Sequence, residues 1–593
     1  MRPTRLVAAA AALLLPAALV PLASHADAAA SYTVTTLHFK VVTGPANDQV
    51  CDILGDVYVP ASATPATPAP AILATNGFGG SKDDLASDAA SFADHGYVVL
   101  AYSGLGFGGS SCKITLDDPD WDGKAGSQLV SYLGGADGIG YADADHTQPV
   151  PPLTVVQRDN KDHLGNKSTN DPRVGMIGGS YGGQIQFAVA SVDPRLDTII
   201  PEITWNDLSY SLDPNNTDQT SGVSTRTPGA AKLIWAAGFS AEGLTGDLQN
   251  QQTQPDAAPC PNFADWVCPA LVSAGTTGYL PPEDIARLRH ASVASYMSKI
   301  KIPTLLMQGQ NDTLFNLNEA VATYQALRAQ GTPVKMIWKE GGHSGPAASG
   351  EFDYLTPRIY GWFDHYLKGQ NTSTGPAFAY FRDWVSYAGS AVPAYASSTS
   401  FPVGTSRTWR LSGAGALTSG TTAAPGSQSF VTPAAGAPTS VDELDVLGGY
   451  TGQVPQTVND DPGTFAAWTS PVLTSDVDVV GSPVVQLKVD APTAAVSQAT
   501  GPGGMLVLFV KVSDVGPDGT SRLIHGLEAP VRIPDVTKPF TIRLPGIVHR
   551  FAAGHQLRLT VAGGSANYRG GLTAVPVTIA SGSTQTLTLP VVP

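Results

Sequence analysis

Short apolar runs recur through the first two thirds of the chain, and the segments between them carry apolar residues at helical spacing. Runs of this length are typical of strands buried on both faces. They lie at residues 71–74, 97–102, 174–177, 196–200, 302–307 and 335–338. One intervening helix is marked by Leu317, Val321, Tyr324 and Leu327, which share one helical face. Strands that alternate with helices in this way predict a mostly parallel α/β sheet.

The pattern changes twice along the chain. From residue 201 to about 300, short helices joined by polar loops replace the strands, which predicts a helical cap inserted into the sheet domain. Beyond residue 385, apolar residues alternate with polar ones, as in Val485–Val489 and Leu557–Val561. Such alternation indicates half-buried strands, so this half is predicted to be an all-β sandwich of jelly-roll type. The predicted domains are therefore 29–385, with the cap at about 201–300, and 386–593.

The first 28 residues have the three parts of a secretory signal peptide. Two early arginines precede an Ala/Leu-rich run, and Ala26–Ala28 form an A-x-A cleavage site. The alternative is a membrane anchor, but Pro16 and Pro21 interrupt the run, which is short for a membrane span. We therefore predict that residues 1–28 are removed and that the protein is secreted and extracellular.

The acidic composition narrows the range of partners. The chain has 593 residues, enough for two or three domains, and a net charge of −15 at pH 7. A surface of this charge repels the phosphates of nucleic acids and of anionic lipids. We expect a small peptide or ester as the partner, and neither nucleic acid nor membrane.

Four cysteines follow the leader: Cys51, Cys112, Cys260 and Cys268. An even number in an exported chain indicates two disulfides, for which three pairings are possible. We favour Cys260–Cys268, which closes a short loop, and by elimination Cys51–Cys112. No metal site is predicted, because the cysteines have neither a paired C-x-x-C motif nor a histidine cluster beside them. The acidic run at 117–122 lacks the glycine and the glutamate of an EF-hand loop, so a solvated turn is expected there.

The segment Val174–Gly183 has the pattern of a buried strand, a sharp turn and the start of a helix, and it contains Gly178-x-Ser180-x-Gly182. In a nucleophile elbow, a Cβ at either glycine would strike the neighbouring strand or helix, while the serine hydroxyl stays exposed. The following helix directs its N-terminal N–H groups toward the place where an oxyanion forms. Ser180 is therefore the predicted nucleophile. The alternative is a glycine-rich turn that only packs tightly.

A serine nucleophile needs a histidine base and an orienting carboxylate, which in α/β-hydrolases follow in the order serine, acid, histidine. Asp312 follows the strand at 302–307, and His343 follows the strand at 335–338, so both lie on the sheet edge that carries Ser180. We predict that these three residues form the catalytic triad. Asp312 could instead cap the next helix, and His343 could be a surface loop residue.

An oxyanion hole requires two hydrogen-bond donors. One is expected to be the backbone N–H of Tyr181, directly after the nucleophile. The other should come from the loop after the strand at 71–74, where Gly77-Phe78-Gly79 stands, and we assign it to the N–H of Phe78. The alternative for this loop is a glycine turn that packs under the elbow.

Together these motifs resemble those of the Xaa-Pro dipeptidyl-peptidase and cocaine esterase group of serine hydrolases. The matching features are Gly178–Gly183, Asp312, His343, the segment Trp362–Gly369 and the segment Gly554–Leu559. The resemblance implies an α/β-hydrolase domain, a helical cap and a C-terminal jelly roll, and the hydrolysis of amide or ester bonds without a cofactor. Several members supply a tyrosine hydroxyl to the oxyanion hole from the early loop, where this chain has Phe78.

The resemblance favours a secreted serine hydrolase of the Xaa-Pro dipeptidyl-peptidase type that works through an acyl-enzyme. The alternative on the same machinery is a carboxylesterase or acylase of the cocaine esterase type. An alternative of another class is a non-catalytic surface or carbohydrate-binding protein. A dipeptidyl-peptidase needs a carboxylate that holds the free ammonium of its substrate, and Glu202, Asp207 and Glu242 are candidates in or near the cap.

Overall fold

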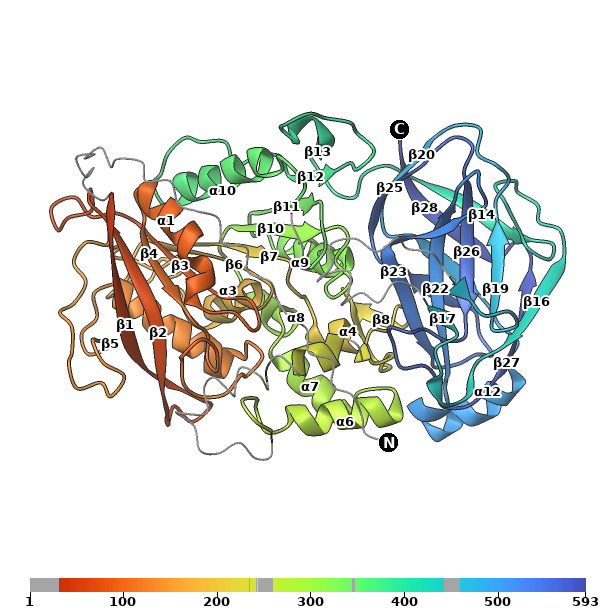
Figure 1. Cartoon of the computed structure of the whole chain (residues 1–593), viewed down its shortest axis with the longest axis horizontal. Coiled ribbons are helices and arrows are strands. Elements are labelled where there is room, and N and C mark those ends of the chain that lie inside the picture. The colour runs from red at the N-terminus through yellow and green to blue at the C-terminus, as the bar shows by residue number, and fades with distance from the viewer. Residues whose placement is uncertain (1–30, 234, 241–242, 244–259, 344–346, 442–458) are drawn as a thin grey trace, which may run out of the picture.

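The computed structural model describes residues 31–233, 235–240, 243, 260–343, 347–441 and 459–593. Figure 1 shows two parts: a sheet covered by helices, coloured red to green, and a part built mainly of strands, coloured teal to blue. The predicted leader, residues 1–28, lies outside the described residues. None of the helices within these ranges is both long and apolar enough to cross a membrane.

In the described part of the chain, the first sheet has 11 strands with a parallel centre. In spatial order they are β13 (Tyr395–Ser398), β12 (Phe378–Phe381), β11 (Val334–Lys339), β10 (Thr304–Gly309), β7 (Thr198–Glu202), β6 (Val174–Gly179), β3 (Ala71–Thr75), β4 (Val98–Tyr102), β2 (Gln49–Pro60), β1 (Tyr32–Thr43) and β5 (Gly140–Tyr141). Neighbours from β12 to β4 run parallel, and the pairs at both edges are antiparallel. Every residue of β3 and β4 is buried, so their sequences are continuous apolar runs. The predicted, mostly parallel α/β sheet is confirmed.

Helices cover both faces of this sheet. Those on one face are α1 (Ala86–Asp94) and α10 (Phe352–Tyr366), and those on the other are α2 (Lys124–Leu133), α3 (Tyr181–Val192) and α9 (Leu317–Ala329). Successive strand residues point to opposite faces. Ile72 therefore joins the core under α1 and α10, and its neighbour Leu73 joins the core under the other three helices.

Between β7 and β10 the chain leaves the sheet and forms a cap. Its elements are α4 (Leu208–Leu212), the hairpin of β8 (Gln219–Ser221) and β9 (Ser224–Thr225), α6 (Val267–Thr277), α7 (Pro282–His290), α8 (Val293–Tyr296) and the short helix Met297–Lys299. Residues 235–240 are also helical. Apolar cap residues such as Trp205 and Phe263 share one core with Tyr181 and Phe315, so the cap packs over the carboxyl ends of β6 and β10.

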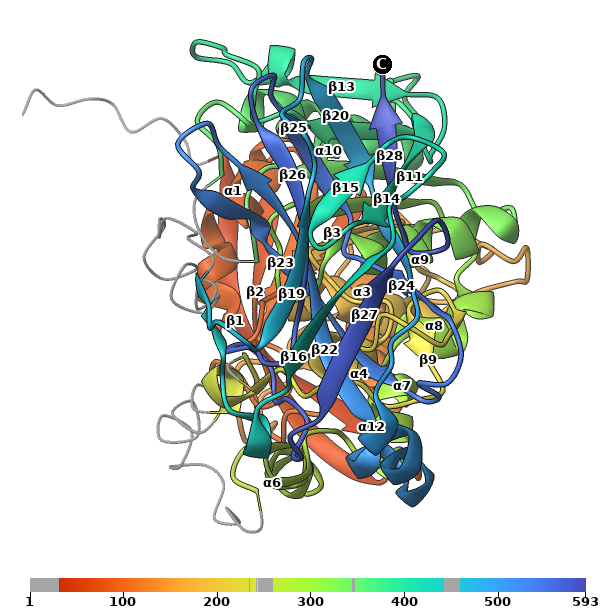
Figure 2. The ribbon, with the colours of Figure 1, turned by 90° about the vertical axis from the view of Figure 1, so that its right-hand side faces the viewer.

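The second part, from residue 405 onward, is a sandwich of strands. They are β14 (Thr405–Ser412), β15 (Ala416–Thr418), β16 (Gly426–Val431), β17 (Ser440–Val441), β18 (Asn459–Asp460), β19 (Phe465–Thr469), β20 (Val477–Gly481), β21 (Val484–Leu487), β22 (Leu506–Val515), β23 (Ser521–Ile533), β24 (Phe540–Arg543), β25 (Ile547–Phe551), β26 (Gln556–Ala562), β27 (Pro576–Ser581) and β28 (Thr586–Val592), with α12 (Pro492–Ser497). β16 and β27 pair side by side in Figure 2, apart from the large sheet. Their residues Phe430 and Ile579 share a core with Trp468 and Leu559 of that sheet. The predicted all-β sandwich is confirmed.

The first sheet continues past residue 385, the predicted end of the first domain. β13 pairs antiparallel with β12 and forms the edge of this sheet, which therefore extends to Ser398. The sequence of β13, Tyr-Ala-Ser-Ser, has no apolar run. Its membership in the sheet depends on its partner strand, so the pattern of the sequence does not reveal it.

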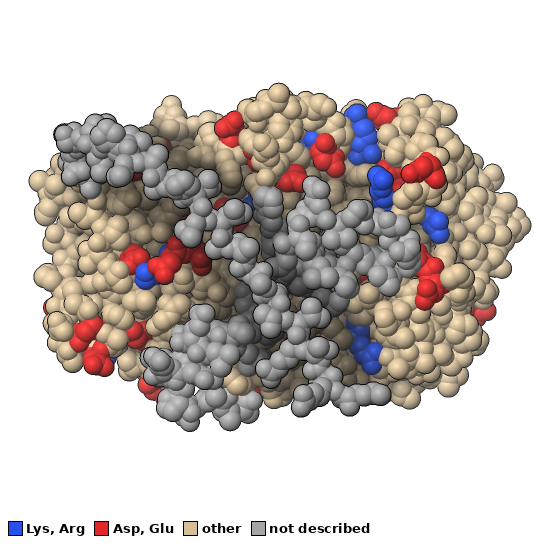
Figure 3. Space-filling view, viewed as in Figure 1, with Lys and Arg blue, Asp and Glu red and all other residues tan. Residues whose placement is uncertain are grey.

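Both disulfides join the pairs favoured from the sequence. Cys51 of β2 is bonded to Cys112, and Cys260 is bonded to Cys268 of α6. The second bond ties the start of α6 to the segment before it. On the face shown in Figure 3, acidic side chains are spread over both parts of the molecule, and basic side chains lie mainly over the sandwich.

Candidate active site

Ser180 lies at the sharp turn between β6 and α3, with backbone angles φ 56° and ψ −118°. A non-glycine residue at positive φ is strained, and close packing on both sides of the turn holds it there. A Cβ on Gly178 would lie 2.7 Å from the carbonyl oxygen of Gly182, and one on Gly182 would lie 2.4 Å from that of Thr75. Neither separation leaves room for a side chain, so the turn requires both glycines of the motif.

The structure brings Ser180, His343 and Asp312 into one hydrogen-bonded series. The Oγ of Ser180 lies 2.8 Å from Nε2 of His343, and Nδ1 of His343 lies 3.0 Å from Oδ2 of Asp312. The three residues follow the carboxyl ends of β6, β11 and β10, which lie at one edge of the sheet. The ring of His343 is packed edge-on against Trp235 and Phe315, which fixes its plane.

Asp312 is fully buried, and backbone groups hold its carboxylate. Oδ1 accepts the N–H groups of Leu314 and Phe315 at 3.0 and 2.8 Å, and Oδ2 accepts the side-chain amide of Gln308 at 3.0 Å. The N-cap residue of the following helix α9 is Asn316, so Asp312 does not cap that helix. With its orientation fixed, the carboxylate can hold His343 in one tautomer with Nε2 facing the serine.

The two predicted oxyanion donors lie beside Ser180. Tyr181 is the first residue of α3, where backbone N–H groups have no partner within the helix. Within the described ranges, the N–H groups of Phe78 and Tyr181 donate to no other protein group. A Cβ on Gly77 would lie 3.8 Å from Cβ of Ser180, so the Phe78 loop borders the nucleophile. The Phe78 ring packs against Phe107, Phe239 and Phe263, with centroids 5.0–5.9 Å apart.

The acidic run at 117–122 is only in part the solvated turn expected from the sequence, because Asp118 and Asp120 are partly exposed but the other two aspartates are not. Asp117 and Asp122 have no exposed surface, and both lie behind Tyr181. The Tyr181 hydroxyl accepts the N–H of Asp117 at 3.1 Å and lies 3.5 Å from Oδ2 of Asp122. Burial raises the pKa of Asp122 to about 7, and burial together with the Asp122 charge raises that of Asp117 well above its usual range.

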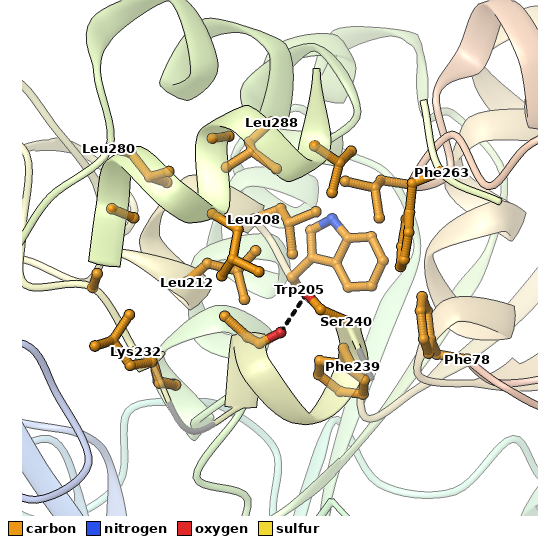
Figure 4. A pocket seen from close by; sticks show the side chains of 18 of the residues that line it. Phe78, Trp205, Leu208, Leu212, Lys232, Phe239, Ser240, Phe263, Leu280 and Leu288 are labelled. Atoms are coloured by element: carbon orange, nitrogen blue, oxygen red, sulfur yellow. Dashed lines mark hydrogen bonds between the residues drawn. The ribbon is translucent and has the colours of Figure 1, made fainter. Parts of the chain in front are cut away.

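An apolar pocket of about 120 Å³ opens beside Ser180 under the cap (Figure 4). Beyond Phe78 and Tyr181 its walls include Trp205, Leu208, Leu212, Phe239, Phe263, Leu280 and Leu288. Among the described residues that line it, Lys232 and Ser240 also carry charged or hydroxyl groups, and both groups are engaged. Lys232 donates to the carbonyl oxygens of Thr313 and Leu314 at 2.7 and 2.9 Å, and Ser240 donates to a carbonyl of its own helix at 2.8 Å. The apolar cap segments were visible in the sequence, but not their convergence on Ser180.

Two of the carboxylates considered as ammonium partners, Glu202 and Asp207, do not line this pocket. Glu202 pairs with Lys339 at 3.0 Å. Asp207 is fully buried, and it accepts the N–H of Ser209 and the guanidinium of Arg289, each at 3.0 Å. Glu242 lies outside the described residues. No described candidate is placed to hold a cation in the apolar pocket.

A second cavity of about 210 Å³ lies beside His343, and its lining combines apolar with charged side chains. Glu202, Lys339, Glu340 and Glu351 contribute to its lining. Glu351 is fully buried and accepts the backbone N–H of Glu340 at 2.8 Å. Burial and the Glu351 charge raise the pKa of Glu340 to about 7. The apolar pocket thus borders the nucleophile, and the second cavity borders the base.

One group of side chains within the described ranges could hold a metal ion. It consists of Asp118, Asp120 and His290, whose ligand atoms lie within 4.8 Å of one another. Nε2 of His290 lies 3.4 Å from Asp118 and 3.2 Å from Asp120, distances that also suit ion pairs. The group contains no residue of the triad, and His290 is exposed.

Two family models match the chain. The model described as X-Pro dipeptidyl-peptidase (S15 family) matches residues 51–345, which include Ser180, Asp312 and His343. The model described as the X-Pro dipeptidyl-peptidase C-terminal non-catalytic domain matches residues 368–570, which include most of the sandwich. No curated protein matches the sequence.

Several solved structures share the fold over nearly the whole chain. An alpha-amino acid ester hydrolase is 16% identical with a TM-score of 0.60, covering 96% of this chain and 98% of that one. An aminopeptidase from the marine sediment archaeon Thaumarchaeota archaeon is 13% identical with a TM-score of 0.62, covering 97% and 98%. A CocE/NonD family hydrolase from Staphylococcus aureus is 14% identical with a TM-score of 0.57, covering 94% and 97%. These likenesses confirm the predicted fold, an α/β-hydrolase domain followed by a jelly-roll sandwich.

Proposed function

This chain belongs to the S15 family of X-Pro dipeptidyl-peptidases and is a serine hydrolase, and from that premise we propose that it transfers an apolar acyl group to Ser180 and then to water. Its substrates on this proposal are small esters, or amides, of apolar carboxylic acids. The observation that carries the proposal is the apolar pocket at Ser180, whose described lining contains no carboxylate.

In the first step, Ser180 attacks the carbonyl carbon of the substrate. His343 accepts the hydroxyl proton at Nε2, which lies 2.8 Å from Oγ. Asp312 keeps the ring oriented and stabilises the imidazolium that forms. The N–H groups of Phe78 and Tyr181 donate to the oxyanion, and that stabilisation needs no tyrosine hydroxyl at position 78.

The intermediate then collapses. The bond to the leaving alcohol or amine breaks, and the leaving group takes the proton from Nε2 of His343. Water, deprotonated by the same nitrogen, attacks the acyl-enzyme and releases the carboxylic acid and free Ser180. The second cavity borders His343, the residue that supplies the proton to the leaving group.

The pocket chemistry favours an uncharged acyl group. Each methylene that it buries contributes about 0.8 kcal/mol. A substrate ammonium in the same place would lose its hydration without gaining an ion-pair partner among the described residues, which costs more than a methylene contributes.

Removal of Xaa-Pro dipeptides is the second candidate, and the family match favours it. It would require a carboxylate to hold the free N-terminus of the peptide. Glu202 is engaged with Lys339, and Asp207 is engaged with Arg289. For this reason we rank the ester and acylated substrates first.

The test is a comparison of kcat/KM for an Xaa-Pro p-nitroanilide, its N-acetyl form and p-nitrophenyl butyrate. We expect the ester and the blocked anilide to be cleaved and the free ammonium to confer no advantage. A preference of about 100-fold or more for the free-ammonium substrate, equivalent to about 2.8 kcal/mol, would overturn the proposal in favour of a dipeptidyl-peptidase. Failure of a fluorophosphonate probe to label Ser180 would indicate a non-catalytic protein.

We also propose that the protein acts outside the cell on a small peptide or ester, with neither nucleic acid nor membrane as partner. The leader pattern in the sequence and the two disulfides support export. N-terminal sequencing of the protein recovered from the culture medium should begin after Ala28. Recovery only from the cell, with Met1 retained, would contradict export.

A further inference from the structure

Arg532 is a buried arginine of the sandwich whose side chain lies among segments of the cap. It belongs to β23 and is 1% exposed. Its Nε donates to the carbonyl oxygen of Gly229 at 2.8 Å, its Nη2 to that of Gly278 at 3.0 Å, and its Nη1 to that of Pro502 at 2.6 Å. One guanidinium therefore joins two cap segments to the sandwich.

Both cap segments form walls of the apolar pocket. Gly229 precedes Ala231, Lys232 and Leu233, which line it. Gly278 is the C-cap of α6, and α6 lines the pocket with Val267, Ala270, Leu271 and Ala274. The Gly278 carbonyl also accepts the N–H of Ala231 at 3.2 Å, so the two walls meet at the oxygen that Arg532 binds.

Further contacts hold the cap against the sandwich around Arg532. Asn215 of the cap bonds both backbone groups of Arg532, at 3.1 and 3.0 Å. Arg569, also from the sandwich part, donates its backbone N–H to Ala231 at 2.8 Å and its Nε to Gly275 of α6 at 3.2 Å. The guanidinium of Arg532 stacks on Tyr279, 4.9 Å from the ring centroid. The same cap walls are thus held at several points from outside the hydrolase domain.

The chemistry of arginine suits this task. Burial lowers the pKa of Arg532 to about 10, against the opposing effect of Asp213, so the group stays charged at neutral pH. A planar fork with five N–H donors can reach three carbonyl oxygens that face it from different directions. A lysine has one nitrogen and cannot span the same three acceptors.

We propose that Arg532 is a positioning residue through which the sandwich sets the width of the apolar pocket and thereby the acyl groups that the enzyme accepts. The inference rests on the proposed function, because it assumes that the pocket holds the acyl group. It assigns a part of substrate selectivity to a domain that contains no residue of the triad.

The test uses the full chain and three esters, p-nitrophenyl acetate, butyrate and octanoate. For Arg532→Met we compare kcat/KM for octanoate with kcat/KM for acetate. The ratio of the two should change by about tenfold or more, mainly through KM, because small changes in an apolar pocket alter discrimination between acyl groups by this amount. Arg532→Lys should change it less. Acetate turnover and fluorophosphonate labelling of Ser180 should stay within about threefold of wild type, because the triad is not touched.

The control is Arg550→Met, since Arg550 pairs with Asp478 inside the sandwich at 2.7 and 2.8 Å. Breaking this ion pair should destabilise the sandwich without contacting the pocket walls. If Arg532 had only such a structural role, its substitution would likewise lower the rates for all three esters by the same factor. If Arg532→Met does not fold, Arg532→Lys and Arg569→Met carry the test, and an unchanged ratio in both overturns the inference. Wild-type protein that cleaves no ester would instead contradict the proposed function itself.

Discussion

The triad and the apolar pocket meet at Ser180, but they are built in opposite ways. The triad residues follow three parallel strands, and directional bonds of 2.8–3.0 Å hold them in place. The pocket consists of apolar side chains from the early loop, several cap segments and Phe315. Packing without directional bonds determines its shape.

This difference separates the two properties of the enzyme. A triad fixed by backbone geometry should respond to substitution in an all-or-none manner, because a displaced proton acceptor fails altogether. A packed pocket should respond in degrees, because apolar contacts contribute in proportion to buried area. Substitutions can therefore test whether chemistry and selectivity are separable here.

The largest effect is expected for Ser180→Ala, which removes the nucleophile. The rate constant kcat should fall by about 10⁶-fold, as when triad residues are removed from other serine hydrolases. The melting temperature should not decrease, because the hydroxyl carries no structural bond except that to His343. Ser240→Ala, at the other serine of the pocket, is the matched control and should keep kcat within about tenfold. An equal decrease of kcat in both variants would show that Ser180 has no special part in catalysis compared with the pocket residues.

Asp312→Asn should lower kcat/KM by about 10⁴-fold while the fold is retained. The amide cannot accept the Nδ1 proton in the same way and favours the wrong tautomer of His343. The measurement is kcat/KM on one ester across the pH range, with Glu340→Gln as the control for a nearby acid. If Asp312→Asn stays within about tenfold of wild type, Asp312 is not the acid of the triad.

Leu288→Ala should alter selectivity in degrees. Leu288 is 2% exposed and lines the pocket, so truncation enlarges the pocket. We expect the preference to move toward bulkier acyl groups by about tenfold, within the range that one or two methylenes provide. Leu129→Ala, at a buried residue of α2, is the matched control, because both truncations cost about 2–5 kcal/mol of stability. A shift of selectivity in the control as well would mean that general loosening, not pocket shape, sets the preference.

The smallest effect is a dependence of stability on pH at the base of the cap. Glu319 of α9 accepts the N–H groups of Asn206 and Asp207 at 2.8 and 3.1 Å, directly before α4. Burial raises the pKa of Glu319 to about 8 in the folded protein. The contribution of this group to stability is therefore complete below its pKa in the unfolded chain, and it is lost as pH rises from there through 8. A single titrating group such as Glu319 changes the unfolding free energy by at most about 1.4 kcal/mol per pH unit.

The measurement is the melting temperature between pH 5 and 8.5 for wild type and Glu319→Gln. The variant cannot titrate, so its melting temperature should fall less steeply with pH than that of wild type. Glu283→Gln, at an exposed glutamate of α7, should leave the slope unchanged. Equal slopes in wild type and Glu319→Gln would show that Glu319 is not the titrating group.

The strands of the first sheet could be predicted because burial on both faces leaves an apolar run in the sequence itself, as in β3 and β4. β13 could not, since a short edge strand with two serines has no such run and is recognised only through β12. The prediction that the acidic run at 117–122 is solvated was wrong for two of its residues, for a similar reason. Aspartates are usually exposed, and only the chain folded around Asp117 and Asp122 shows that these two are buried.

By itself, the sequence determined the elbow at Ser180 and the order of Asp312 and His343 behind it. Both are properties of the chain: the turn depends on two glycines within five residues, and parallel strands bring their carboxyl ends to one edge. Only the tertiary structure decided what surrounds Ser180. The apolar pocket joins segments from Phe78 to Phe315, and Arg532 reaches two of its walls from the other domain. Apolar contacts carry no directional signature, so the sequence cannot show which apolar residues become neighbours until the chain has folded.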